Sequence, residues 1–100
     1  HDVYTSIPLK NIDVLMLDLP EPWKVLPHTG CLKSGGFIAS YSPTISQTSD
    51  FVEAVKSTSN LLFLKTVEVL SRDWELDKRT VRPESRMMGH SGFITFARRI

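Results

Sequence analysis

The sequence predicts a single α/β domain in which strands and helices alternate, and three observations lead to this prediction. Residues 12–19, IDVLMLDL, form a nearly continuous apolar run with β-branched members, which is typical of a strand buried on both faces of a parallel sheet. Helix-like segments follow this strand and the next one, as in right-handed crossovers between parallel strands. No helix-like segment separates the last two strands, so we expect them to pair antiparallel. The predicted order is β-α-β-α-β-β.

Prolines and glycines mark the ends of the first helix and the second strand. A helix can begin at Pro22, Pro27 makes it short or broken, and the glycine pair at 35–36 ends it. Residues 36–43, GFIASYSP, then predict a second strand that Pro43 stops.

The second half of the chain predicts one more helix and two more strands. Apolar residues repeat at helical spacing in residues 48–59, TSDFVEAVKSTS, and Thr48, Ser49 or Asp50 can cap the start of this helix. A long β-rich run predicts the third strand over residues 61–76. Residues 77–91 read as a polar, basic connection, and the alternating segment 92–100 predicts the last strand.

Composition places the chain among ordinary globular proteins and excludes several classes. The chain has 100 residues, of which 41% are hydrophobic and 23% charged. Its longest apolar run is far shorter than the ~20 residues of a membrane helix, and no secretory signal pattern is present. The single cysteine, Cys31, cannot form an internal disulfide and gives no metal-binding pattern. We therefore expect a cytoplasmic protein without a metal site or a membrane partner.

The small net charge of +1 is unevenly distributed. Residues 1–71 hold five Lys or Arg and seven Asp or Glu, whereas residues 72–100 hold seven and four. A basic end can attract phosphate groups. On charge alone, however, ordinary surface charge is the simpler explanation.

The stretch LDLPEPW, residues 17–23, ends a predicted strand on an aspartate followed by two prolines. Ligands of open α/β sheets bind beyond the carboxyl ends of the strands, where Asp18 is expected to lie. Pro20 and Pro22 fix two backbone angles, so the loop holds the carboxylate in one place. An alternative is that Asp18 caps the following helix.

Two further residues follow the second predicted strand and are candidates for contact with a nucleobase. The aromatic face of Tyr41 can hold a base by stacking, worth roughly 1–3 kcal/mol. A strand-end tyrosine that packs against a helix is the alternative. Gln47 can read a base edge or simply cap the next helix.

Four segments resemble, in the right order, the tRNA (adenine-58-N1)-methyltransferase family, especially its archaeal-type members. They are the opening DVY, then LDLPEPW, GGFIASYSPTISQ and RDWELDKRTVRPESRMMGHSGFITFAR. The resemblance covers essentially the whole chain. It implies the C-terminal half of a Rossmann-like class I methyltransferase sheet, with residues 1–100 as one partial domain. The family's glycine-rich cofactor loop would then lie upstream of His1.

The resemblance also implies an activity and its partners. The enzyme would transfer a methyl group from S-adenosylmethionine to N1 of adenine 58 in the T-loop of tRNA, and family members suggest a homotetramer. Asp18 would stabilise the cationic adenine and lie beside the methionyl end of the cofactor, together with Leu19 and Pro20. Asp2 would accept a hydrogen bond from the adenine amino group of the cofactor, and Val3 would offer its backbone N–H. A solvated aspartate near a chain end is the alternative for Asp2.

The most family-specific stretch, VRPESRMMGHSGF, offers Arg82, Arg86 and His90 as tRNA contacts. The resemblance places this loop over the mouth of the active site, near the target base. Ordinary surface charge for the arginines and a backbone-bonded hairpin residue for His90 are the alternatives. We expect His28 to be structural. Trp23 and Trp74 are expected to be packing residues, although Trp23 is close enough in sequence to Asp18 to wall its pocket.

Three other functions remain open at this stage. One is a non-catalytic tRNA-binding subunit of the same fold, against which the intact DLPEP motif argues. Another is a class I methyltransferase for another substrate, which leaves the basic loop unexplained. A nicotinamide dehydrogenase is disfavoured because a terminal antiparallel pair is not its usual ending.

Overall fold

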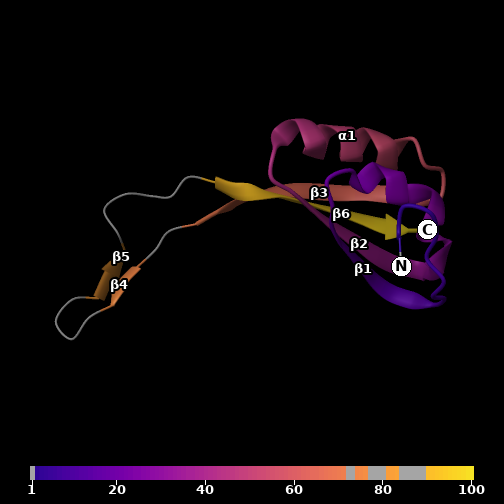
Figure 1. Cartoon of the computed structure of the whole chain (residues 1–100), viewed down its shortest axis with the longest axis horizontal. Coiled ribbons are helices and arrows are strands. Elements are labelled where there is room, and N and C mark those ends of the chain that lie inside the picture. The colour runs from indigo at the N-terminus through magenta and orange to yellow at the C-terminus, as the bar shows by residue number, and fades with distance from the viewer. Residues whose placement is uncertain (1, 72–73, 77–80, 84–89) are drawn as a thin grey trace.

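The computed structural model describes residues 2–71, 74–76, 81–83 and 90–100 of the chain. In chain order the elements are β1 (Ile12–Asp18), the 3₁₀ helix η1 (Pro22–Cys31), β2 (Leu32–Ser42), α1 (Ile45–Lys56), β3 (Leu61–Leu70), β4 (Trp74–Leu76), β5 (Val81–Pro83) and β6 (His90–Arg99). Figure 1 shows α1 and η1 on one side of a sheet, and the small β4–β5 hairpin projecting beyond it.

The main sheet has the strand order β1-β2-β6-β3, in which β1 and β2 are parallel. Strand β6 lies between β2 and β3 and pairs antiparallel with both. Strand β3 therefore runs in the same direction as β1 and β2. The predicted α/β class, the parallel first strands and the terminal antiparallel pair are all confirmed.

One face of the sheet is buried under α1 and η1, and it holds the core. The pairing puts Leu17, Ile38 and Ala97 on this covered face, where all three are buried. Helix α1 contributes Phe51 and Val55, both fully buried, against them. Burying each of these side chains other than the small Ala97 stabilises the fold by roughly 1.5–3 kcal/mol.

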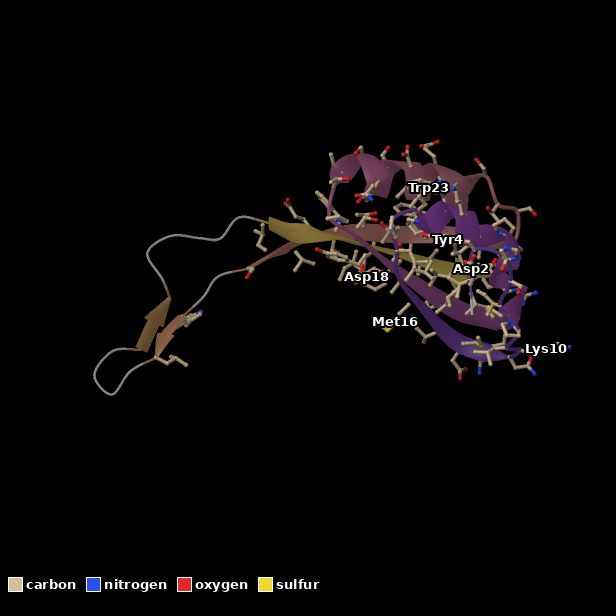
Figure 2. The ribbon with its side chains drawn as sticks, viewed as in Figure 1. Asp2, Tyr4, Lys10, Met16, Asp18 and Trp23 are labelled. Atoms are coloured by element: carbon tan, nitrogen blue, oxygen red, sulfur yellow. The ribbon has the colours of Figure 1, made fainter. Side chains whose placement is uncertain are left out.

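The opposite face of the sheet, called the open face below, is not covered by the described elements. It includes Val14, Met16, Phe37 and Leu62, which are 49%, 79%, 42% and 48% exposed. Figure 2 shows the Met16 side chain pointing away from the helices. Among the described residues only one face of β1 is covered, so the predicted burial of residues 12–19 on both faces stays a prediction for the complete sheet.

The glycine pair at 35–36 does not end the first helix, as we expected, but lies inside β2. Helix η1 ends at Cys31, and β2 begins directly afterwards. Gly35 has a positive φ of 84°, and a Cβ at Gly36 would lie 3.1 Å from the Asp13 carbonyl oxygen of β1. These glycines accommodate the irregular start of the β1–β2 pairing, where the register shifts between Ile12 and Val14.

Helix α1 begins earlier than predicted. Its N-cap is Thr44, whose side chain accepts a hydrogen bond from the Gln47 backbone N–H at 3.2 Å. Thr48, Ser49 and Asp50 are helical residues rather than caps. The Thr-x-x-Gln sequence is typical of a capping box, although here the Gln47 Oε1 accepts from the Thr44 hydroxyl.

The predicted long strand 61–76 divides into β3 and β4, and part of the predicted connection 77–91 forms β5 and the start of β6. Strands β4 and β5 pair antiparallel in a sheet of their own. Trp74 in β4 is 57% exposed, so the packing role expected of it is not found within the described residues. In the part of the chain that the structure describes, no helix is long and apolar enough to cross a membrane.

Candidate active site at the carboxyl ends of β1 and β2

Asp18 and Tyr41 lie side by side where the two parallel strands end. Asp18 is the last residue of β1 and pairs in the sheet with Tyr41, the penultimate residue of β2. The carboxylate is exposed, and the tyrosine is half-buried. The predicted position of Asp18 at a strand end is confirmed, and the N-cap of η1 is Glu21 rather than Asp18.

A cavity of about 370 Å³, called the strand-end cavity here, opens at this edge of the sheet. The ends of β1 and β2, the loops that follow them and the first turn of α1 supply its lining, which consists of Asp18, Leu19, Pro20, Tyr41, Pro43 and Gln47. Five of these six residues were predicted as site residues from the sequence. Pro43 was predicted only to stop the second strand.

The loop after β1 is held from two directions. Pro20 and Pro22 restrict the backbone, and Pro22 stands at the start of η1. From α1, the Gln47 Nε2 donates to the Pro20 carbonyl oxygen at 3.0 Å, and its Oε1 accepts from the Thr44 hydroxyl at 2.8 Å. Gln47 therefore belongs to the helix cap, as one alternative held, and it also ties the helix to the loop that carries Asp18.

A second cavity of about 350 Å³, the open-face cavity, adjoins the first. Its lining is Met16, Leu17, Asp18, Ala39, Tyr41, Ile94 and Phe96. Asp18 supplies the one charged group of this otherwise mostly apolar lining, and it shares both cavities with Tyr41. The Asp18 carboxylate and the Tyr41 ring thus lie between the strand-end cavity and the apolar open-face cavity.

The structure places Asp2 and Val3 in a separate turn. The Asp2 Oδ1 accepts a hydrogen bond from the Tyr4 backbone N–H at 2.9 Å, and Val3 packs against the core. Neither residue lines the two cavities beside Asp18. Figure 2 shows Asp2 and Asp18 on different segments.

Tyr4 fixes this N-terminal turn to η1. His28 Nε2 is 2.9 Å from the Tyr4 carbonyl oxygen, and the Glu21 backbone N–H donates to the Tyr4 hydroxyl at 3.3 Å. The structural role expected of His28 is confirmed. Trp23 is partly buried and packs against the core. It lines neither cavity, so it does not form part of the site beside Asp18.

The basic loop is only partly within the described residues. Arg82 lies in β5 and His90 begins β6, while Arg86 lies outside the described residues. Strands β4 and β5 extend away from the sheet, beyond the ends of β3 and β6 (Figure 1). None of the described residues of this loop lines the strand-end cavity, and its place over the active site stays a prediction.

This fold and site define a class of protein. A parallel β1–β2 pair, a last strand inserted antiparallel beside it and an acid at the carboxyl end of β1 are the features of a Rossmann-like methyltransferase. The structure agrees with that of a SAM-dependent O-methyltransferase from Thermotoga maritima at a TM-score of 0.81 and 28% identity, over 100% of this chain and 38% of that one. It also resembles the tRNA (m1A58) methyltransferase TrmI of Aquifex aeolicus, with a TM-score of 0.71 and 26% identity over 92% of this chain and 37% of that one.

The chain belongs to the family described as tRNA methyltransferase complex GCD14 subunit, whose profile matches residues 5–83. A relative from Methanocaldococcus jannaschii, a tRNA (adenine(57)-N(1)/adenine(58)-N(1))-methyltransferase TrmI, is 39% identical over 97% of this chain. The chain spans about 35% of that relative's length. The resemblance stated from the sequence is thereby confirmed at the level of the family.

The residues of the strand-end cavity fit part of an S-adenosylmethionine site. Asp18 offers a carboxylate acceptor, and Leu19 and Pro20 form a rigid wall beside it. These three residues lie at the carboxyl end of β1, where ligands of open α/β sheets bind. Asp2 and Val3 do not join them here, so their role toward the cofactor stays a prediction.

Proposed function

We propose that this chain carries the catalytic acid and the base-holding tyrosine of an S-adenosylmethionine-dependent tRNA (adenine-58-N1)-methyltransferase. The observation that carries the proposal is the Asp18–Tyr41 pair, which lines the strand-end cavity in a chain of this family. The names of the relatives supply the substrate, tRNA, and the position, adenine 58.

The proposed mechanism uses the charge of Asp18 and the ring of Tyr41. When bound, S-adenosylmethionine supplies an electrophilic methyl group. N1 of adenine is unprotonated at neutral pH, so no proton has to leave it before it reacts, and positioning supplies much of the rate. The Asp18 carboxylate accepts a hydrogen bond from the N6 amino group and stabilises the positive charge that grows on the base.

Tyr41 holds the base while this charge develops. Its ring adjoins Asp18 across the strand pair and lines both cavities. A base stacked on this ring would have its polar edge within reach of the carboxylate. The tethered loop keeps the acid in place, since Gln47 bonds the Pro20 carbonyl oxygen. The presence of the acid favours a catalytic role over a non-catalytic tRNA-binding subunit.

We further propose that residues 1–100 act as one half of a catalytic domain. The relatives are nearly three times as long as this chain, since it spans about 35% of one of them. The part that the relatives have in addition would supply the glycine-rich backbone donors that a nucleoside cofactor needs. Asp2 and Val3 would reach that cofactor from their turn beside η1. The isolated chain should therefore bind S-adenosylmethionine far more weakly than the complete enzyme.

The assembled enzyme is proposed to be a cytoplasmic homotetramer that binds tRNA through Arg82, Arg86 and His90. The β4–β5 hairpin supports association between copies, because its Trp74 and Leu76 are 57% and 73% exposed. Exposed apolar side chains on a projecting hairpin are typical of a contact with another chain.

The test is a methylation assay with the complete enzyme that contains this chain. A tRNA transcript with adenine 58 is incubated with S-adenosylmethionine, and modification is mapped by the stop that N1-methyladenine causes in reverse transcription. We expect a new stop at position 58 and none in a transcript with guanine 58. Methylation of another position, or of no tRNA at all, would contradict the proposal.

A further inference from the structure

Gly92 in β6 lies against the hydroxyl end of the Tyr41 ring. A Cβ atom built on Gly92 would be 2.6 Å from both the Cε2 and the hydroxyl oxygen of Tyr41, and 2.7 Å from its Cζ. Real Cβ atoms essentially never approach other atoms this closely, so the ring occupies the space that any other residue would fill. The glycine is itself buried.

The glycine is needed for this space and not for its backbone angle. Among the described glycines only Gly35 has a positive φ, so the backbone of Gly92 is one that alanine also adopts. Gly30 offers a contrast, because a Cβ there would have no other atom within 4 Å. A glycine in a strand interior usually marks a close approach of another group, and here that group is the Tyr41 ring.

The sheet register explains why the ring reaches this position. Tyr41 pairs with Ile94 across β2 and β6, and Gly92 is the diagonal neighbour two residues away on the same face. Long aromatic side chains reach such diagonal positions. The ring therefore leans toward the end of β2, where the strand-end cavity lies.

We propose that Gly92 is a positioning residue that sets the ring of Tyr41 for the target base. The inference rests on the proposed function and adds a residue to its site. An alanine at position 92 would force the ring to recede by roughly 1 Å to reach ordinary contact, and a displacement of this size can cost about 100-fold in rate. Gly92 itself needs no contact with the substrate for this effect.

A double-mutant cycle in the complete enzyme tests the inference. Gly92→Ala should lower kcat/KM for tRNA by about 10- to 100-fold. In a Tyr41→Ala background, where no ring is left to displace, the same Gly92→Ala change should alter kcat/KM less than about twofold. Gly30→Ala is the matched control, since it adds the same methyl group where no atom is near, and it should leave kcat/KM unchanged.

The melting temperature of each variant separates positioning from folding. If Gly92→Ala lowers the melting temperature, Tyr41→Ala should restore most of it, because it vacates the space that the methyl group needs. Equal losses of kcat/KM in the two backgrounds, or a Gly92→Ala enzyme as active as the parent, would overturn the inference. The inference would also be overturned if the enzyme with both Gly92→Ala and Tyr41→Ala stayed unfolded. If the parent enzyme does not methylate tRNA, the proposed function is refuted, whatever the double-mutant cycle gives.

Discussion

The side-chain amide of Gln47 donates a hydrogen bond to the Pro20 carbonyl oxygen at 3.0 Å, across 27 positions of sequence. This bond joins the first turn of α1 to the loop that begins at Asp18. The helix cap is therefore linked to the loop beside Asp18. A change at the start of α1 should shift the position of the Asp18 carboxylate.

Gln47→Met tests this connection, because it keeps the length of the side chain and removes both the donor to Pro20 and the acceptor for the Thr44 hydroxyl. We expect a loss of stability of about 1–2 kcal/mol, for the net contributions of two hydrogen bonds, and a fall in kcat/KM of about tenfold as the loop loosens. Thermal melts and steady-state methylation kinetics measure the two effects. Ser49→Ala, an exposed change on the same helix, is the control. A Gln47→Met enzyme with parental kinetics would limit Gln47 to capping.

Asp18→Asn and Tyr41→Phe separate the two central roles. The first keeps the shape of the acid and removes its charge, so kcat should fall by about 10²–10³, as for the loss of one preorganised electrostatic group. The second keeps the ring and should cost much less if stacking is its role. Single-turnover methylation of tRNA measures both variants. Equal losses would show that the two roles are wrongly assigned.

Arg86→Ala tests the predicted tRNA contact of the basic loop. The variant should bind tRNA more weakly and S-adenosylmethionine as tightly as the parent. If Arg86 contacts a phosphate, the slope of log K against log salt should shrink by roughly 0.7–0.9 units. Lys33→Ala is a control at the other end of β2, where Lys33 is paired with Asp13. Unchanged affinity, slope and kcat would leave Arg86 as surface charge.

The open face of the sheet predicts marginal stability for the chain alone. Met16→Ser should lower the stability of the complete enzyme by about 1–3 kcal/mol, because we expect other parts of the enzyme to cover this face. In the isolated chain the same change removes an exposed side chain and should cost little. Ile45→Ser, at a 63% exposed position in α1, is the control. Equal effects of Met16→Ser in both proteins, measured by urea unfolding, would contradict a covering role.

The hairpin predicts a dependence of assembly on Trp74. Changing Trp74 to Ser together with Leu76 to Ser should shift the complete enzyme toward smaller oligomers, as measured by light scattering. Leu9→Ser, at a position 62% exposed outside the hairpin, is the control. An unchanged molar mass would place the contacts between copies elsewhere.

Sequence reasoning located the acid and the ring because proline and strand patterns are local signals. Asp18 ends an apolar run before two prolines, and Tyr41 precedes Pro43. The positions of Asp18 and Tyr41 at the edge of the sheet therefore follow from the predicted ends of the two strands. The contact between Tyr41 and Gly92 could not be predicted in this way, since it depends on β6 pairing with β2 at a particular register.

The errors have equally specific causes. Gly35 and Gly36 look like a helix end, but inside β2 the first has a positive φ and the second is approached closely by the β1 backbone. The predicted start of α1 is too late because Thr48, Ser49 and Asp50 also fit an N-cap, whereas the structure uses Thr44. Trp74 is predicted to be a packing residue, yet it lies in β4, which pairs only with β5 in a separate small sheet of the described residues.

Strand β6 comes last among the strands along the chain but lies between β2 and β3. During synthesis on the ribosome, β2 and β3 emerge first and have no pairing with each other in the part of the sheet that the structure describes. The two strands become joined in one sheet only after residues 90–99 are translated and β6 pairs with both. Such long-range pairing slows folding and leaves strand edges exposed meanwhile. A nascent chain stalled before β6 should therefore be a substrate for chaperones, whereas one released after it should not.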